Sequence, residues 1–192
     1  MVVLCDAEIK KYLKSGTLKI EPLENPEKQI QPAWVDLRLG NEFRVFKSIH
    51  ISLIDPKQPV EGYTEVVRVE NKPFIIHPGE FVLGVTKEYI KMPNDLMGVV
   101  DGRSSLGRLG VLIHTTSAGI NPGWEGILTL EISNVGKVPV ALYPGMRVCK
   151  LVLHKLSSEP EIPYSERSDA KYHRQKGLEE SKIFREFEEE FS

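Results

Sequence analysis

Short runs of apolar residues, separated by Pro, Gly and Asn, follow one another from Leu18 onward. Several runs alternate apolar and polar positions, which is the pattern of a strand with one buried face. The intervening residues favour turns. Many short strands joined by turns are typical of an antiparallel sandwich or barrel, so the chain is predicted to be mainly β. We expect strands in TLKIEP (17–22), AWVDLRLG (33–40), NEFRVF (41–46), TEVVRV (64–69), FIIHPGEFVLGVT (74–86), LMGVVDG (96–102), VLIHTT (111–116), ILTLEIS (127–133), VPVALYPGM (138–146) and RVCKLVLHKL (147–156).

One helix is expected at the start of the chain. Asp6 is a candidate N-cap, and Ile9, Tyr12 and Leu13 follow it at helical spacing. Gly16 suits the left-handed position that commonly ends a helix. The pattern predicts a single short helix before the first strand.

Two segments have no strand pattern. The segment from Ser48 to Glu65 is the least regular internal stretch and is predicted to be a surface loop. Beyond Leu156 the chain is rich in charged and turn-forming residues, a composition typical of a disordered tail. At its end Phe184, Phe187 and Phe191 have the spacing of a short amphipathic helix.

Length, charge and cysteine content narrow the class of protein. A chain of 192 residues fits one domain, 1–192, and a net charge of -2 gives no broad basic surface for a nucleic acid polymer. No apolar run reaches membrane-spanning length and no export signal is apparent, so a cytoplasmic protein without membrane contact is expected. Cys5 and Cys149 lie far apart, and we expect two buried thiols rather than a disulfide or a zinc knuckle.

The segment GRSSLGRLG (102–110) has the composition of an anion-binding loop. Glycine leaves room for a ligand close to the backbone, arginine offers a forked donor for phosphate, and serine adds hydroxyl groups. Short clusters of this kind are also common in ordinary loops, so a polar turn beside a helix N-terminus is an equal interpretation.

The segment ILTLEISN (127–134) places a carboxylate in the middle of a predicted strand. Leu128, Leu130 and Ile132 share one face, and Glu131 lies on the other. A lone strand glutamate is most often a solvated surface residue. This carboxylate also lies close in sequence to the segment with the composition of an anion-binding loop.

The metal-binding residues of zinc deaminases are missing from this sequence. Those enzymes use an HxE and a PCxxC motif, and neither is present. The five histidines have no metal-ligand spacing. We therefore expect no zinc.

The order of several motifs carries a resemblance to a known family. GRSSLGRLG, INPGWEG, TLEISN and YPGMRVCKLVL, together with the tail PYSERSDAKYHRQKG (163–177), resemble the deoxycytidine triphosphate (dCTP) deaminases of the trimeric dUTPase superfamily. The resemblance covers nearly the whole chain. It implies a distorted antiparallel β-barrel, the dUTPase-like β-clip, with a short N-terminal helix and a C-terminal tail, 156–192, that closes over the nucleotide. It also implies a homotrimer with sites between subunits.

The resemblance also implies roles for individual residues. Glu131 would be the catalytic acid/base, Arg108 would lie beside it and favour its ionised form, and Ser104 would hold the attacking water or the amine. Mg²⁺ would arrive with the triphosphate rather than in a protein site. The implied substrate-binding residues are Arg103, Ser104, Ser105, Leu106, Gly107, Arg108, Ser117, Asn121, Thr129, Leu130, Glu131, Tyr164, Lys171 and Gln175.

Three further residues have more than one interpretation. Trp124 fits core packing and a role lining the nucleotide pocket equally well. His114 could line the site, but a hydrogen-bonded structural histidine is favoured. Asp36 is expected to be a buried partner of a basic group, without a role in the site.

Three classes of function follow from the resemblance. The favoured class is a dCTP deaminase that yields dUTP and ammonia in pyrimidine deoxynucleotide synthesis. The second is a dUTP diphosphatase, or a bifunctional enzyme that converts dCTP to dUMP. The third is a non-catalytic nucleotide-binding regulator. Feedback inhibition by dTTP is left open.

Asn121 and Ala118 bear on the choice between the first two classes. In diphosphatases and bifunctional relatives the position of Asn121 carries an Asp that helps to activate water, and an amide is a poor base. The Gly that bifunctional members carry at the position of Ala118 is also replaced. The His that many monofunctional deaminases carry there is absent too, so this loop alone does not decide between the two classes. The loss of the Asp argues against the second activity, and we predict a deaminase with little diphosphatase activity.

Overall fold

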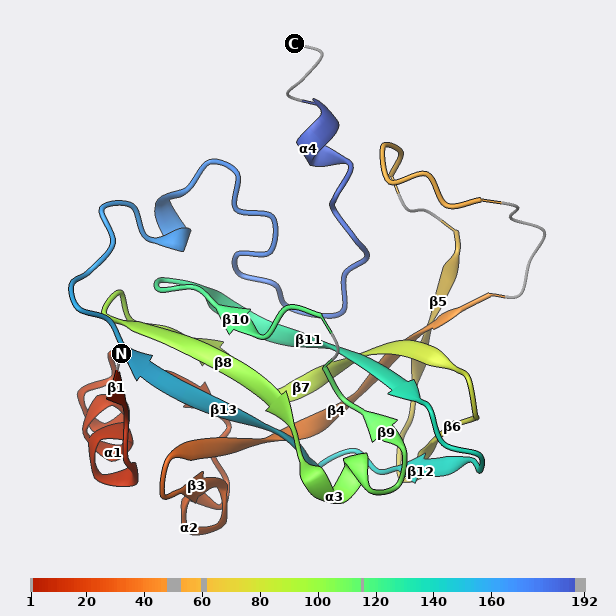
Figure 1. Cartoon of the computed structure of the whole chain (residues 1–192), viewed down its shortest axis with the longest axis horizontal. Helices are drawn as coiled ribbons and strands as arrows, with labels where there is room; N and C mark the ends of the chain where they lie inside the picture. The colour runs from red at the N-terminus through yellow and green to blue at the C-terminus, as the bar shows by residue number, and fades with distance from the viewer. Residues whose placement is uncertain (1, 48–52, 60–61, 115, 189–192) are drawn as a thin grey trace.

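The computed structural model describes residues 2–47, 53–59, 62–114 and 116–188 (Figure 1). Its strands are β1 (Val2–Val3), β2 (Lys19–Glu21), β3 (Ile30–Gln31), β4 (Trp34–Phe46), β5 (Thr64–Arg68), β6 (Phe74–Ile76), β7 (Phe81–Lys91), β8 (Leu96–Gly102), β9 (Val111–Leu112), β10 (Gly119–Ile120), β11 (Glu125–Asn134), β12 (Val140–Leu142) and β13 (Arg147–Lys155). Its helices are α1 (Asp6–Ser15), α2 (Pro26–Gln29), α3 (Ser104–Gly107), the 3-10 turn η1 (Tyr164–Glu166) and α4 (Arg185–Glu188).

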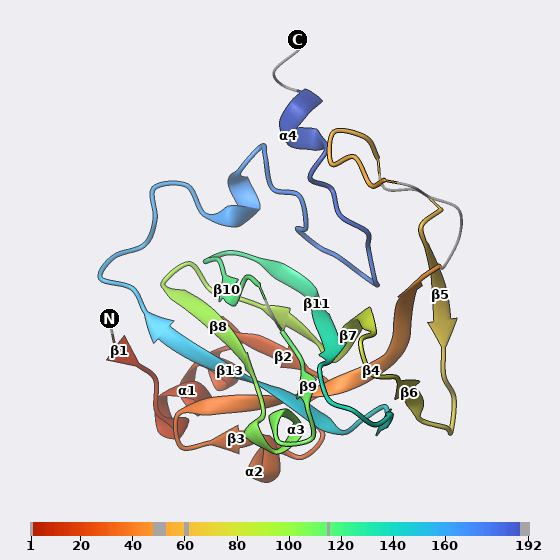
Figure 2. The same ribbon diagram turned by 45° about the vertical axis from the view of Figure 1, so that its right-hand side comes forward.

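Most of the strands form one antiparallel sheet. Its main path runs β10-β8-β13-β4-β7-β11-β9, and β1, β2, β3 and β5 pair at its sides. The strands β12 and β6 form a separate pair. The sheet curls into a half-barrel (Figure 2), because strand twist accumulates across a sheet and bulges increase it. The predicted mainly β, antiparallel fold is confirmed.

The core lies on the inner face of this curled sheet. On β4 the side chains of Val35, Leu37, Leu39 and Phe43 are completely buried. The ring of Phe43 stacks on Phe74 with centroids 4.2 Å apart. Burying an apolar side chain of this size contributes about 1.5–3 kcal/mol to the free energy of unfolding. The apolar side chains whose spacing predicted this strand therefore also stabilise it in the fold.

Strand β11 has the two faces that its sequence predicted. Leu130 and Ile132 are completely buried, while Thr129 and Glu131 are only half-buried. The pairing of β11 with β7 shifts register between Ile127 and Thr129. At this bulge the backbone N–H of Leu128 donates to the Thr86 hydroxyl at 3.1 Å, so the displaced amide keeps a partner.

Helix α1 matches its prediction except at its first residue. Cys5 is the N-cap and Asp6 is already helical, whereas Gly16 ends the helix in the left-handed conformation with φ 74°. Asp6 instead forms an ion pair with Lys10 at 2.9 Å, one turn later. The prediction of two buried thiols is wrong for Cys5, which is exposed; Cys149 is buried.

The segment from Ser48 to Glu65 is only partly described. Residues 48–52 and 60–61 lie outside the described residues, and 53–59 are exposed, as expected of a surface loop. Thr64 and Glu65 belong to β5 rather than to the loop. Among the described residues, no helix has the length and apolar character needed to cross a bilayer.

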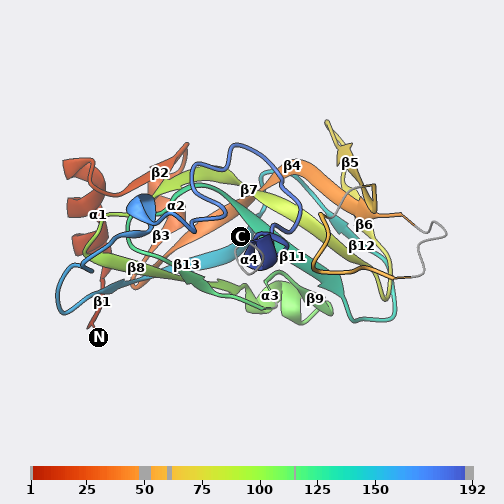
Figure 3. The same ribbon diagram turned by 90° about the horizontal axis from the view of Figure 1, so that it is seen from above.

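The tail after β13 folds back over the barrel. Figures 1 and 3 show it passing above β10 and β11 before it reaches α4. Gln175 and Leu178 within it are buried. The disordered tail that composition suggested is therefore wrong for the described part. Helix α4 covers only Arg185–Glu188, and Phe191 lies outside the described residues.

Candidate active site

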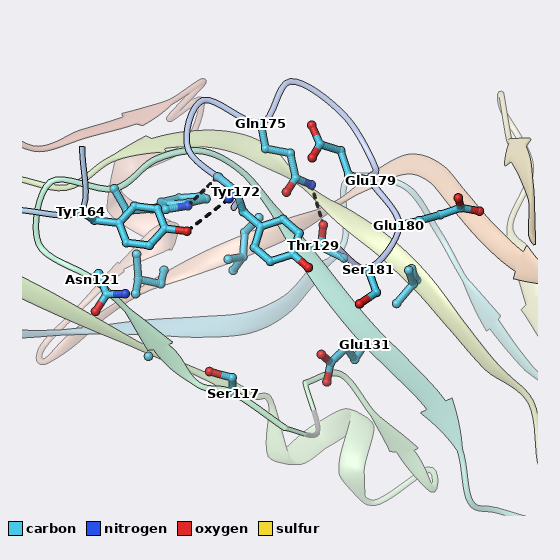
Figure 4. A pocket seen from close by; sticks show the side chains of 15 residues that line it. Ser117, Asn121, Thr129, Glu131, Tyr164, Tyr172, Gln175, Glu179, Glu180 and Ser181 are labelled. Carbon is cyan, nitrogen blue, oxygen red and sulfur yellow. Dashed lines mark hydrogen bonds between the residues drawn. The ribbon is translucent and has the colours of Figure 1, made fainter. Parts of the chain in front are cut away.

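A pocket of about 400 Å³ lies between β11 and the folded tail (Figure 4). We call it the tail pocket. Its lining comes from strands β7 and β11, from the segment 117–124, and from the tail. The lining residues are Leu83, Ser117, Gly119, Ile120, Asn121, Trp124, Leu128, Thr129, Glu131, Tyr164, Tyr172, Gln175, Glu179, Glu180 and Ser181.

Glu131 brings a carboxylate to the tail pocket from the polar face of β11. The Thr116 hydroxyl lies 2.9 Å from one carboxylate oxygen and 2.7 Å from the other. A single hydroxyl shared between both oxygens fixes the orientation of the carboxylate plane. Thr116 could not be found from the sequence, because no local pattern signals that it faces a residue 15 positions later.

Ser117, before β10, and Asn121, directly after it, both line the pocket. His114 donates from Nε2 to the backbone carbonyl of Ser117, which confirms its prediction as a hydrogen-bonded histidine. Its Nδ1 atom is buried and has no hydrogen-bond partner among the described residues. The pairing of β10 with Val99 and Gly98 of β8 then fixes where this loop enters the site.

The aromatic side of the pocket joins the barrel to the tail. Trp124 is 7% exposed, so it packs in the core, and it also lines the tail pocket. Its Nε1 donates to the backbone carbonyl of Tyr172 at 2.9 Å. The backbone N–H of Tyr172 in turn donates to the Tyr164 hydroxyl at 3.2 Å. Tyr172 was missed, although it directly follows a lysine of the tail motif.

Gln175 connects the tail to β11 by its side chain and its backbone. Its Nε2 donates to the Thr129 hydroxyl at 2.6 Å, and its carbonyl accepts from the N–H of Ile127 at 2.8 Å. Gly126 beside it has φ 155°, and a Cβ there would lie 3.0 Å from the Gln175 nitrogen. Only glycine allows the tail backbone to approach β11 this closely.

Two of the expected binding residues, Lys171 and Leu130, do not line the tail pocket. Lys171 forms an ion pair with Glu186 within the tail and does not line the tail pocket. Leu130 is completely buried in the core, because it occupies the inner face of β11. Its contribution to binding could only come through its backbone.

The segment that resembles an anion-binding loop also lies away from the tail pocket. It forms α3 and its flanks, in which Ser104 and Ser105 are exposed. Arg103 lies with Nε 3.8 Å from Asp36, which is buried and forms a second ion pair with Arg147 at 3.0 Å. Asp36 is thus the buried partner of basic groups, as expected. None of the following expected residues lines the pocket: Arg103, Ser104, Ser105, Leu106, Gly107 and Arg108.

The charges around the tail pocket are acidic. Its described lining holds the carboxylates of Glu131, Glu179 and Glu180 but no Lys or Arg. Glu179 pairs with Lys182, and Glu180 with Arg44 at 2.7 Å. An anionic ligand such as a triphosphate needs cationic donors, and the described lining of this pocket supplies none.

No candidate metal centre accompanies these carboxylates in the described part of the chain. There, no three His, Cys, Asp or Glu side chains are close enough together to hold a metal ion.

Comparison with known sequences gives a consistent result over almost the whole chain. A family model described as "dCTP deaminase-like" matches residues 3–156. The chain is 51% identical over 191 residues to the "dCTP deaminase, dUMP-forming" of Methanothermobacter thermautotrophicus, covering 98% of this chain and 97% of that protein. It is 48% identical over 185 residues to the "dCTP deaminase" of Natronomonas pharaonis, covering 95% of each.

A solved structure shows the same fold. The chain is similar to the 2'-deoxycytidine 5'-triphosphate deaminase from Agrobacterium tumefaciens, with a TM-score of 0.62 and 24% sequence identity. The match covers 80% of this chain and 48% of that one, so this chain spans about half the length of the solved protein.

Proposed function

This chain belongs to the dCTP deaminase-like family and is a dCTP deaminase, and we propose that it carries its product on to dUMP. The observation that carries the second step is the 51% identity, over nearly the full length, to a relative named dUMP-forming. Asn121 by itself favours dUTP as the final product. The relatives favour dUMP as the final product. We give their identity over nearly the whole chain more weight than a substitution at one position.

We propose that Glu131 moves the protons of the deamination. It would take a proton from a water that adds to C4 of cytosine, deliver a proton to N3, and pass another to the amine that leaves as ammonia. The position of Glu131 on the open face of β11, oriented by Thr116, supports this assignment. The carbonyl of Ser117, across the pocket, would hold the same water.

The diphosphatase step would cleave dUTP by attack of water on the α-phosphate, which releases pyrophosphate. Asn121 can donate a hydrogen bond to the 3'-hydroxyl of the sugar, but its amide is not a base. The second reaction would thus use a different base from the Asp of other bifunctional enzymes. Asn121 is also the observation that favours a deaminase that stops at dUTP.

We further propose that the phosphates are held by a neighbouring subunit of a homotrimer. The lack of Lys and Arg in the described lining of the tail pocket supports this, as does the position of Arg103 and Arg108 outside it. These arginines would then face the pocket of another copy. Mg²⁺ would arrive as part of the dCTP complex, since it binds phosphate oxygens readily.

Products of dCTP hydrolysis test the proposed function. Purified protein with dCTP and Mg²⁺ should release ammonia and pyrophosphate in equal amounts, with dUMP as the main nucleotide on ion-exchange chromatography. Accumulation of dUTP with little pyrophosphate would contradict the dUMP-forming reaction and support the dUTP-forming enzyme. The matched variant Asn121→Asp restores a carboxylate at this position and should speed pyrophosphate release without slowing ammonia release.

A further inference from the structure

We propose that Arg44 is a positioning residue that holds the tail in place and so forms one wall of the tail pocket. Arg44 lies on β4 and is not among the described residues that line the pocket. Its effect would therefore pass through the tail residues that it contacts. The proposal rests on the proposed function, because it requires dCTP to bind in the tail pocket. Its test therefore includes a measurement of tail position that does not depend on activity.

The guanidinium of Arg44 binds the tail at two points. Its Nη1 donates to the Glu180 carboxylate at 2.7 Å, and its Nη2 lies 3.5 Å from the carbonyl of Leu178. Nη1 also donates to the Thr64 hydroxyl at 2.9 Å, and Thr64 itself bonds Glu180. The ion pair is well covered, because the side chains of Arg44 and Glu180 are 19% and 20% exposed. Such a pair is screened less than one on the open surface.

A second residue of β4, Glu42, also contacts Leu178 of the tail. The carboxylate of Glu42 accepts from the backbone N–H of Leu178 at 3.0 Å. The Leu178 side chain is 6% exposed, so it is packed rather than lying across the surface. Glu42 and Arg44 are two positions apart on β4 and share a face of the sheet. Together they therefore bind the stretch of tail from Leu178 to Glu180.

The position of Arg44 in the sheet links this grip to the proposed catalytic carboxylate. Arg44 on β4 pairs with Leu83 on β7, and Leu83 pairs with Glu131 on β11. Paired residues on neighbouring strands point to the same face, and strands lie about 4.8 Å apart. Arg44 and Glu131 thus occupy one cross-strand row, roughly 10 Å apart by strand spacing.

The held stretch of tail is the part that completes the pocket. Glu179, Glu180 and Ser181 line it together with Tyr172, and Figure 4 shows Ser181 near Tyr172 on the side away from Ser117. Pairing with Arg44 also neutralises the Glu180 carboxylate beside a site for a polyanion. Loss of Arg44 would both loosen this wall and leave a negative charge near the substrate.

Two single variants, Arg44→Gln and Glu180→Gln, and the double variant test the proposal. Each single change should raise KM for dCTP about fivefold with little change in kcat, because a loosened wall weakens substrate binding. The double variant should be no worse than the singles, since both remove one contact. Arg44→Lys keeps the charge and should raise KM less. Glu166→Gln, a change to an exposed tail carboxylate outside the pocket, should leave KM unchanged.

Limited trypsin digestion gives the readout that does not depend on dCTP. The tail contains Lys176 and Lys182, and cleavage there should be faster in Arg44→Gln and Glu180→Gln than in wild type or Glu166→Gln. Glu180→Gln changes only the tail and keeps the test valid if Arg44→Gln fails to fold. Equal cleavage rates in wild type and Glu180→Gln would overturn the proposal. Effects on KM that multiply in the double variant would overturn it as well.

Discussion

The environment of Glu131 fits the acid/base role that we propose for it. Its carboxylate is half-buried on the polar face of β11, and the Thr116 hydroxyl holds both of its oxygens. A group held in one orientation meets substrate without reorganisation, which is a large part of the advantage of a positioned acid/base. Leu130 and Ile132, on either side, anchor the strand in the core.

We predict that Glu131→Gln abolishes deamination while the fold and nucleotide binding remain. The amide cannot accept a proton from water, so ammonia release should fall by at least about 1,000-fold. Coupled ammonia assays, circular dichroism and calorimetric titration with dCTP measure the three properties. Glu65→Gln, at an exposed position of β5, is the matched control. Ammonia release by Glu131→Gln at near-normal rates would refute the assignment.

Glu42 gives the docking of the tail a pH dependence. Burial acts to raise the pKa of Glu42, but the Leu178 N–H and Arg68 stabilise the ionised form more, and the pKa falls below its ordinary value of 4.5. A carboxyl whose pKa is lowered in the folded state stabilises it fully above the ordinary pKa and loses this effect as the pH falls. Tail docking should therefore weaken below pH 4.5.

Hydrogen exchange at the Leu178 amide measures this effect. The protection factor, corrected for intrinsic exchange, should be constant above pH 4.5 and decline below it. In Glu42→Gln it should be lower throughout and lack this decline. A wild-type protection factor that stays level through the same range would show that Glu42 does not hold the tail.

At the scale of elements, the tail works as part of the barrel rather than as an appendage. Gln175 bonds Thr129 of β11, Trp124 bonds the backbone of Tyr172, and Leu178 is packed against the sheet. Strand β11 has glycine at Gly126, where a Cβ would lie only 3.0 Å from the backbone nitrogen of Gln175 in the tail. A segment that composition marks as disordered is thus ordered by the strand beneath it.

Removal of every residue after Leu156 should raise KM for dCTP strongly and abolish turnover. The truncated protein would lack Tyr164, Tyr172 and Gln175, which close the pocket, so water and substrate would be held poorly. The barrel should stay folded, because β13 is the last strand along the described chain and the truncation removes no strand of the main sheet. Steady-state kinetics and the circular dichroism spectrum report the two properties. Kinetics equal to those of the full chain would show that the tail has no part in the site.

At the scale of the whole molecule, one chain separates two halves of the expected site. Glu131 lines the tail pocket, whereas Arg108 lies beyond α3 and is exposed outside it. A nucleotide triphosphate needs both a carboxylate at the base and cations at the phosphates. Closed symmetric assembly would bring the two halves together, since every copy presents both surfaces.

Mixing two inactive variants tests this arrangement. Glu131→Gln and Arg108→Ala should each be inactive alone. After the subunits are denatured together and refolded in equal amounts, about a quarter of the sites between copies should contain both native residues, because each is present with a probability of one half. Ammonia release should recover to that fraction of wild type. Absence of any recovery, with mixed oligomers demonstrated by mass spectrometry, would place both residues in the same chain's site.

The sequence by itself determined the features that depend on local pattern. Alternation along β11 placed Leu130 and Ile132 inward and Glu131 outward, and turn residues marked where most strands end. The spacing of α1 and the glycine after it predicted the first helix. These predictions succeed because strand and helix periods are set by the backbone within a few residues.

Only the tertiary structure decided which distant segments meet. Three contacts join residues whose spacing in sequence carries no signal: Thr116 with Glu131, Arg44 with Glu180, and the Trp124 indole N–H with the Tyr172 carbonyl. Their meeting depends on the register of β4, β7 and β11 and on the path of the tail, and one residue of slip would turn every side chain to the other face. The sequence likewise suggested that the residues of α3 lie in the same site as Glu131. In the fold of a single chain, these residues do not line the tail pocket.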